Sequence, residues 1–452
     1  MPVQLGKAPI SDKDLVIAAI VGSTLTFLLL TFLYYPKKSQ VPLAVSLFIA
    51  TNMLSRAKIF GRLYDKLTQP SLKLPSLQGG NYHRFAQLNQ LSQVELLTAI
   101  KSLQSYATNS KKSNDRRKKL FKLMSWRQQK LCQDVGYLQK LNKIDQSINS
   151  NQKILNQIAE SAIDVYGLSF RDFELLKNSS SSNVSSSNYR VVETLGHYVR
   201  DWSLSTELSP LLAYINSQLS SVIPRNHSNT CIIIPGSGLG RLAHEVAKSN
   251  DWGAVHAVEY SGLMHICNEF IYNNKSNLEL FPHIHSCSNF TSTKSQFRPI
   301  SIDSNVAKPA NLHLHHQDFR YFQIPNLDQF DTVVIVSAFF IDTAENLIDY
   351  FDTINHLTTP SRNNKNLKKG FWINIGPLKY GSAAQAELNS EEITKIRKKI
   401  GWNDLHHDVT LNNKETPLSA VFSQQPSYSS TDTGPGPTGV LFAFYRTPSI
   451  HQ

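Results

Sequence analysis

A glycine-rich turn and a distant carboxylate form the pattern with the clearest chemical meaning. Gly236, Gly238 and Gly240 follow an apolar, β-branched run, and the residues from Arg241 onward place apolar side chains on one helical face. Glycine lets the backbone approach a ligand closely, and a helix N-terminus favours an anionic group. Glu259 ends the next apolar run, about 20 positions later, where a carboxylate suits the hydroxyls of a ribose. The pattern predicts a site for a nucleoside-containing cofactor.

The glycine spacing narrows the choice of cofactor. Gly-x-Gly-x-Gly differs from the Gly-x-Gly-x-x-Gly of dinucleotide-binding folds. It suits S-adenosylmethionine, which presents an amino-acid end and one adenosine without a pyrophosphate. A turn without a ligand and a nicotinamide-dependent oxidoreductase remain the alternatives. The predicted contacts in this part of the site are Gly236, Gly238, Gly240, Arg241 and Glu259.

Two further positions follow expected strands, at the edge where open α/β sheets bind ligands. Asp318 is predicted to accept a hydrogen bond from the adenine amino group, and Phe319 to cover the adenine face. The alternative is a helix N-cap beside a core phenylalanine. Asp342 follows the next expected strand, where it would orient a nitrogen nucleophile towards the methyl group; the alternative is a helix cap. The predicted substrate-binding residues are Phe339, Phe340, Asp342 and Tyr380.

The remaining chemistry-bearing residues predict no other catalytic class. No His, Cys or Asp cluster has metal-ligand spacing, so no metal is expected. Four unpaired cysteines indicate free thiols. Methyl transfer from an activated donor depends mainly on alignment and desolvation, which a site with few titratable groups can provide.

Alternating apolar runs and amphipathic segments from residue 189 onward indicate an α/β sheet. We expect a class I methyltransferase-like sheet of seven mostly parallel strands with flanking helices, and loops at 289–311 and 424–437. Helical spacing characterises residues 82–176, and a serine-rich loop is expected at 178–188. The predicted strands are 231–234, 254–258, 312–314, 331–337, 371–375, 408–411 and 440–445.

The N-terminal region predicts a membrane anchor. Residues 15–35 carry no charge and are long enough for a helix to cross a bilayer core of about 30 Å. Lysines follow the span, so we expect a single-pass protein with its catalytic domain in the cytosol. The predicted regions are an anchor at 1–60, a linker at 61–81, a helical region at 82–188 and an S-adenosylmethionine-binding methyltransferase domain at 189–452.

Positive charge is concentrated in the helical region. The chain has a net charge of +12, and residues 101–145 hold 12 Lys and Arg against 3 Asp and Glu. A solvated helical face explains this segment most simply, with an anionic membrane surface as the next alternative. Nucleic acid is not expected as a partner, because no aromatic residues are interleaved with the charges. Homodimer formation is left open.

Several motifs together resemble the carnosine N-methyltransferase family. This resemblance implies an S-adenosylmethionine-dependent enzyme that methylates an imidazole ring nitrogen of a histidine-containing dipeptide. It implies that Asp342 contacts the imidazole, that Glu259 binds the ribose, and that Asp318 and Phe319 lie on the adenine side. The motifs lie at 198–203, 235–243, 259–261, 281–285, 317–319, 339–350 and 372–378.

The chain also departs from the pattern of this family on the substrate side. Members usually carry His after the tyrosine of the Gly-Pro-Leu motif, whereas Gly381 follows Tyr380 here. We therefore expect a carnosine-like dipeptide or a histidine in a peptide as acceptor. The alternative is a catalytically inactive membrane tether or interaction protein with the same fold.

Overall fold

The computed structural model describes residues 82–169, 171–174, 184–203, 208–287, 290–360, 366–410 and 439–446. The chain divides into two compact units, Met1–Gln78 and Gly79–Gln452, and every described residue lies in the second unit. The anchor predicted at 1–60 and the linker predicted at 61–81 lie outside the described residues. The predicted domain boundaries therefore stay predictions.

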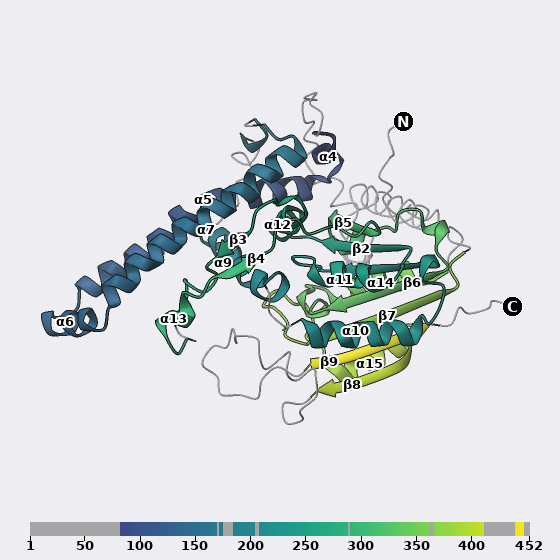
Figure 1. Cartoon of the computed structure of the whole chain (residues 1–452). Helices are drawn as coiled ribbons and strands as arrows, with labels where there is room; N and C mark the ends of the chain where they lie inside the picture. Colours follow the sequence, from purple (N-terminus) through teal and green to yellow (C-terminus); the bar gives the residue numbers. More distant parts are fainter. Residues whose placement is uncertain are drawn as a thin grey trace, which may run out of the picture. The chain divides into compact units, whose positions relative to one another are not determined.

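A mixed sheet forms the centre of the second unit (Figure 1). Its first five strands in sheet order run parallel, and β9 is antiparallel to both of its neighbours. The predicted class I methyltransferase-like architecture, an α/β fold with a mostly parallel sheet, is confirmed. In sheet order the strands are β5 (Leu312–His316), β2 (Ala254–Glu259), β1 (Thr230–Pro235), β6 (Thr332–Ala338), β7 (Lys369–Pro377), β9 (Gly439–Arg446) and β8 (Asn403–Thr410).

The order of the strands reverses between β1 and β6. Strands β1, β2 and β5 extend in one direction from this point, and β6 and β7 extend in the other. In an open α/β sheet, a ligand binds outside the carboxyl ends of the strands at such a switch point. The chain segments that follow β1, β2, β5, β6 and β7 are therefore the ones that can build a site.

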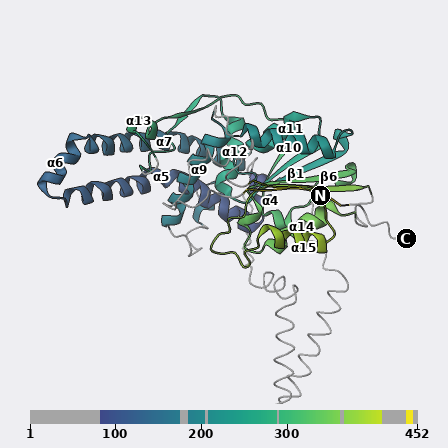
Figure 2. The same ribbon diagram turned by 90° about the horizontal axis from the view of Figure 1, so that it is seen from below.

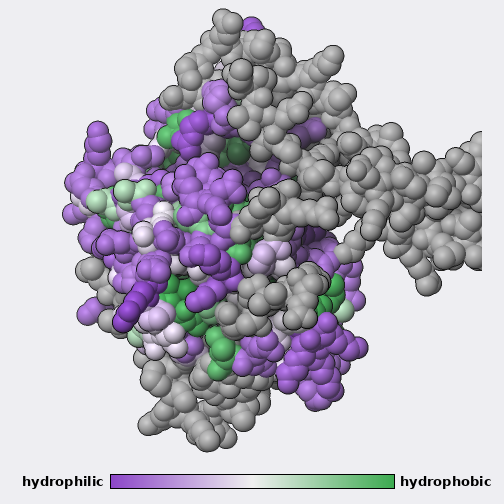
Figure 3. Space-filling view, turned by 90° about the vertical axis from the view of Figure 1, so that its right-hand side faces the viewer, coloured by the Kyte–Doolittle hydropathy of each residue, from purple (hydrophilic) through white to green (hydrophobic). Residues whose placement is uncertain are grey.

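Helices cover both faces of this sheet, which Figure 2 shows nearly edge-on. On one face α10 (Ser209–Val222) and α11 (Arg241–Ser249) bury Ile232, Ile234 and Val334. On the other face α14 (Leu347–Thr358) and α15 (Ser390–Lys399) cover Ile233, Val333 and Trp372. Alternate residues of each strand thus enter opposite cores. The described surface in Figure 3 is mostly hydrophilic, with small hydrophobic patches.

A long helical hairpin projects from the sheet, and we call it the arm (Figures 1 and 2). Helices α5 (Gln90–Lys122) and α7 (Tyr137–Tyr166) form its two sides, and α6 (Trp126–Asp134) lies at its tip. Asn89 caps α5 by accepting the Ser92 N–H at 2.8 Å. Leu96, Leu97, Ile100 and Leu103 of α5 are buried in one core with Leu141, Ile144, Ile148, Leu155 and Ile158 of α7. The helical interpretation of this region is confirmed over its described residues.

The same core joins the arm to the sheet domain. Helix α9 (Val184–Asp201) and helix α12 (Gly262–Asn273) contribute Val191, Leu195, Leu263 and Ile266 to it. Short helix α4 (Tyr82–Gln87) adds Phe85. The base of the arm is therefore held against the sheet domain by a shared apolar core.

Three details of the predicted secondary structure are wrong. The loop expected at 178–188 is partly helical, because α9 already begins at Val184. The loop expected at 289–311 contains α13 (Thr293–Gln296) and β4 (Ile300–Ile302), which pairs with β3 (Leu278–Leu280) in a separate two-stranded sheet. Strand β8 begins at Asn403, earlier than predicted. Three-residue strands bury too few side chains to show a period in the sequence, since a period of two needs a longer run.

The predicted localisation requires correction. None of the helices in the described part of the chain combines the length and the apolarity that crossing a bilayer requires. Helices α5 and α7 are long enough, but charged side chains recur along both of them. Over the described residues, this finding contradicts the prediction of a single-pass membrane protein facing the cytosol. The segment 15–35, on which that prediction depended, lies outside the described residues.

Candidate active site

The glycine-rich turn joins β1 to α11 in a conformation that side chains would obstruct. Gly236 and Gly240 have φ values of +60° and +78°. A Cβ atom on Gly236 would lie 2.4 Å from the Phe340 ring, and one on Gly240 would lie 2.2 Å from Asn268 Nδ2. Glycine is required at both positions because both the backbone conformation and the available space exclude a side chain.

Glu259 lies at the carboxyl end of β2, beside this turn. Its carboxylate accepts the Gly238 N–H at 2.7 Å and the Ser261 N–H at 2.8 Å. Burial raises the pKa of Glu259, and these two backbone donors oppose the shift. The structure thus joins the predicted glycine loop and the predicted ribose carboxylate through a direct hydrogen bond.

A cationic side chain near the turn was not predicted as a site residue. Arg200 Nη2 lies 3.9 Å from the position of a Cβ atom on Gly238. Asp201 holds the same guanidinium, with Arg200 Nε donating to Oδ1 at 2.6 Å. Trp202, which follows Asp201, donates from Nε1 to the Leu239 carbonyl at 2.7 Å and so fixes the backbone of the turn. In the sequence, only the aromatic and charged segment 198–203 indicated that a residue such as Arg200 could lie near the glycine turn.

Arg241 lies beside the turn but is engaged by protein groups. Its Nε donates to Glu245 at 2.7 Å, and its guanidinium lies 5.1 Å from the centre of the Trp202 ring. Its predicted contact with the cofactor stays a prediction. Ser237 differs, because its buried Oγ has no hydrogen-bond partner within the described ranges.

Asp318 and Phe319 follow β5 and begin a short 3₁₀ helix. The Asp318 carboxylate accepts the Arg320 N–H at 2.9 Å and its guanidinium Nη2 at 2.5 Å. Asp318 is thus the N-cap that the sequence offered as an alternative, and its contact with adenine stays a prediction. Phe319 is buried, and its ring meets the Phe340 ring edge-on at 5.5 Å.

The segment after β6 brings Asp342 to the same edge of the sheet. Asp342 is 8% exposed and accepts the Lys379 N–H at 2.9 Å through Oδ2. Burial raises the pKa of Asp342, and the backbone donor partly offsets this effect. The backbone N–H of Lys379, which follows the end of β7, therefore fixes the position of the Asp342 carboxylate.

The backbone beside Asp342 is strained. Phe339 has a φ of +54°, which is uncommon for a residue with a side chain. Its N–H donates to the Ile375 carbonyl at 2.7 Å, and a Cβ atom on Gly376 would lie 3.0 Å from its Cα. Such conformations persist only where the surroundings enforce them, and they cluster at functional sites.

An aromatic group joins the two parts of the site. The Phe340 ring contacts Gly236 and stacks on Tyr350 of α14, with ring centres 4.5 Å apart. Tyr350 was not predicted as a site residue, although it belongs to one of the motifs quoted above. Tyr380 is held by its hydroxyl, which donates to the Leu388 carbonyl at 2.7 Å. The structure thus collects residues from the ends of β1, β2, β5, β6 and β7.

Comparisons with known proteins identify the family to which the chain belongs. The family model described as carnosine N-methyltransferase matches residues 177–428, more than half of the chain. The chain is 31% identical to the carnosine N-methyltransferase of Schizosaccharomyces pombe over 66% of its own length and 79% of that protein. It is 30% identical to the mouse carnosine N-methyltransferase, over 67% of this chain and 76% of that one. The chain belongs to the carnosine N-methyltransferase family.

Other similarities include a yeast protein and solved structures. The uncharacterized protein YMR209C of Saccharomyces cerevisiae is 30% identical, over 63% of this chain and 67% of that protein. Among solved structures, phosphoethanolamine N-methyltransferase 2 of Haemonchus contortus matches with a TM-score of 0.31 and 18% identity, over 52% and 53% of the two chains. A score this low supports no inference, so the fold assignment rests on the strand order.

Family membership decides between the enzyme classes left open by the sequence. The chain is an S-adenosylmethionine-dependent N-methyltransferase and not a nicotinamide-dependent oxidoreductase. The family supports neither the expected membrane anchoring nor a homodimer. The groups beside the glycine turn fit the methyl donor, because a carboxylate and a guanidinium lie near Gly238, where a ribose and an amino-acid carboxylate need opposite partners. The buried, unpartnered hydroxyl of Ser237 adds a further group for a ligand.

Proposed function

We propose that this enzyme methylates an imidazole ring nitrogen of a histidine-containing dipeptide or peptide. One observation carries the proposal: a buried carboxylate, Asp342, lies after β6 and is fixed by the Lys379 N–H. An imidazole has two ring nitrogens, and a fixed hydrogen-bond acceptor can hold one while the other reacts. The family's named substrate, carnosine, contains such a ring.

Asp342 has two functions in this proposal. Its carboxylate accepts the N–H of the ring, which directs the lone pair of the other nitrogen towards the methyl carbon. Formation of the new C–N bond would break the methyl–sulfur bond of the donor and leave S-adenosylhomocysteine. Positive charge then develops on the imidazole, and the nearby carboxylate stabilises it. The ring proton leaves to solvent after the transfer. S-adenosylmethionine supplies an activated methyl group when bound, so alignment is the main task of the protein.

The remaining site residues divide between the two ligands. We assign Glu259 to the ribose hydroxyls and Arg200 to the carboxylate of the methionine end. Asp318 and Phe319 are assigned to adenine, and Phe339, Phe340 and Tyr380 to the wall of the acceptor pocket. The stacked rings of Phe340 and Tyr350 lie between these groups and favour a positively charged neighbour, since aromatic faces attract cations.

Product analysis tests the proposal. The purified full chain is incubated with S-adenosylmethionine carrying a labelled methyl group and with a panel of carnosine, other histidine dipeptides and a histidine-containing peptide. Fragmentation by mass spectrometry then locates the label. We expect the label on the imidazole ring of at least one member. Labelling of an amine or carboxylate instead, or binding of S-adenosylmethionine without turnover of any imidazole, would contradict the proposal.

A further inference from the structure

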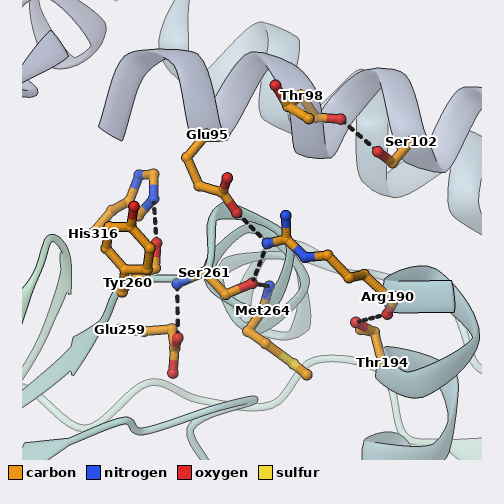
Figure 4. A network of polar contacts seen from close by, with 10 residues as sticks. All are labelled: Glu95, Thr98, Ser102, Arg190, Thr194, Glu259, Tyr260, Ser261, Met264 and His316. Atoms are coloured by element: carbon orange, nitrogen blue, oxygen red, sulfur yellow. Dashed lines mark hydrogen bonds and ion pairs between the residues drawn. The ribbon is translucent and has the colours of Figure 1, made fainter. Parts of the chain in front are cut away.

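The base of the arm contacts the turn that carries the proposed ribose carboxylate (Figure 4). Arg190 of α9 pairs with Glu95 of α5, and its Nη2 also donates to Ser261 Oγ at 3.3 Å. Ser261 is the N-cap of α12, where its Oγ accepts the Met264 N–H at 3.4 Å. The Ser261 N–H in turn donates to Glu259 at 2.8 Å. A continuous set of contacts therefore runs from the arm to Glu259.

The backbone of the arm approaches the same turn. A Cβ atom on Gly262, the first residue of α12, would lie 2.9 Å from the Glu95 carbonyl oxygen and 3.0 Å from Leu96 N. Only a residue without a side chain allows this approach without a shift of α5. The close backbone contact places α5 directly against Gly262, and the ion pair independently links α5 to Ser261 through Arg190.

Charge supports this contact. Burial, which by itself lowers the pKa of Arg190, is outweighed by Glu95, so the pKa is raised and the guanidinium stays charged. Glu193 and Tyr260 also lie near enough to act on it electrostatically. Removing Arg190 would leave Glu95 of the arm without its ionic partner and Ser261 Oγ without its donor from α9.

We infer that Arg190 is a positioning residue, which holds Ser261 and thereby fixes Glu259 for the ribose of the methyl donor. The inference rests on the proposed function, in which Glu259 binds the ribose. The backbone N–H groups that hold Glu259 include one from the glycine turn and one from Ser261. The arm thus acts on one of the main-chain groups that hold this carboxylate. Cofactor affinity would then depend on α5 and α9, neither of which follows a strand of the sheet.

Ligand titrations with the full chain test this inference. The ligands are S-adenosylhomocysteine and its 2′,3′-dideoxy analogue, which lacks the hydroxyls that Glu259 would bind. We expect Arg190→Ala to weaken S-adenosylhomocysteine about tenfold, the effect of losing one charge-assisted contact, with little change for the analogue. Glu95→Gln removes the ionic partner alone and is expected to act in the same direction but less. Arg190→Lys keeps the charge and should restore part of the affinity.

Arg84→Ala is the matched control. Arg84 of α4 pairs with Glu269 of α12 at 2.6 Å, so this variant also removes an ion pair between the helical region and α12. Glu269 lies about two turns along α12 from Ser261. We expect Arg84→Ala to leave both affinities unchanged. Equal weakening of the two ligands by Arg190→Ala would indicate general loosening and would overturn the inference, as would no weakening of either. If the unaltered chain binds neither ligand, the proposed function fails instead.

Discussion

The two halves of the site are built in different ways. In the cofactor half, Glu259 is held by backbone N–H groups of Gly238 and Ser261, at the ends of adjacent strands β1 and β2. In the acceptor half, Asp342 depends on Lys379 across β6 and β7, and its neighbour Phe339 has a strained backbone. The first half uses main-chain donors that any sequence supplies once glycine permits the turn. In the second half the donor is also a main-chain N–H, but it lies across the β6–β7 pair, and the backbone that leads to Asp342 is strained at Phe339.

This difference separates binding from chemistry. A change in the cofactor half should act on the affinity for the methyl donor, because Glu259 does not meet the acceptor in our proposal. A change in the acceptor half should act on turnover, because Asp342 contacts the reacting ring and not the methyl donor in our proposal. Phe340, which touches Gly236 and lies two residues before Asp342, is the bridge between the halves.

The largest effect is expected from Asp342→Asn. The amide still accepts the Lys379 N–H, so the fold should be kept, but it cannot stabilise the positive charge on the ring. We expect kcat to fall about 100- to 1,000-fold, as for the loss of one electrostatic group in other active sites. Isothermal titration should give an S-adenosylmethionine affinity within about twofold of the unaltered chain.

Asp349→Asn is the matched control for this change, because Asp349 lies in the first turn of α14 and is not assigned to the site. It should leave kcat unchanged. If Asp342→Asn retained full turnover, the assigned role of the carboxylate would be refuted. If it abolished cofactor binding as well, the two halves would not be separable.

Glu259→Gln should give the converse result. Replacing the carboxylate removes charge-assisted hydrogen bonds to the ribose, which corresponds to about a 10- to 100-fold loss of affinity. At saturating S-adenosylmethionine, kcat should be close to that of the unaltered enzyme. Steady-state kinetics separates the two quantities. A fall in kcat at saturation with an unchanged KM for the donor would place Glu259 in the chemistry and not in binding.

The pH dependence of cofactor binding tests the role of Glu259 in the cofactor half. Because burial raises the pKa of Glu259, its carboxyl group takes up a proton at a higher pH than an ordinary Glu, whose pKa is about 4.3. The ionised form is the better acceptor for ribose hydroxyls. The affinity for S-adenosylhomocysteine should therefore fall as the pH is lowered through this raised pKa. Calorimetry across the acidic range measures the effect, and Glu259→Gln should remove it.

Gly381→His tests whether the loop after Tyr380 contributes to binding of the acceptor. The family pattern described in the sequence analysis has His after the tyrosine that corresponds to Tyr380. A Cβ atom on Gly381 would meet no atom within 4 Å. We expect the variant to raise kcat/KM for carnosine about two- to tenfold, the effect of one added neutral hydrogen bond. Gly381→Ala is the control without a donor. An unchanged kcat/KM in both variants would indicate an acceptor that does not reach this loop.

The structural elements around the glycine turn are easier to predict from the sequence than the backbone that leads to Asp342, for a physical reason. The glycine turn, its strand and its helix are contiguous, so their residue types and spacing are visible in one stretch. The predicted strands 254–258 and 312–314 lie within β2 and β5 because buried parallel strands are near-continuous apolar runs. The positive φ of Phe339 depends on the pairing of β6 with β7 and on Gly376, which no local pattern reveals.

The residues that the sequence missed are brought to the site from other elements. Arg200 lies in α9, before the sheet begins, and reaches Gly238 only because Trp202 anchors that helix end to Leu239. Tyr350 reaches Phe340 from α14. The start of α9 was hidden by a serine-rich composition typical of loops, and the short strands β3 and β4 were hidden by their length. Tertiary packing decides such cases.

A crystal structure of the full chain with S-adenosylhomocysteine and carnosine tests the central claim most directly. Our account predicts the ribose hydroxyls on Glu259 and one imidazole N–H within hydrogen-bond distance of Asp342. The other ring nitrogen should then face the sulfur of the cofactor along the path of the missing methyl group. A cofactor bound away from the turn at 236–240, or an imidazole whose ring nitrogens both point away from Asp342, would contradict it.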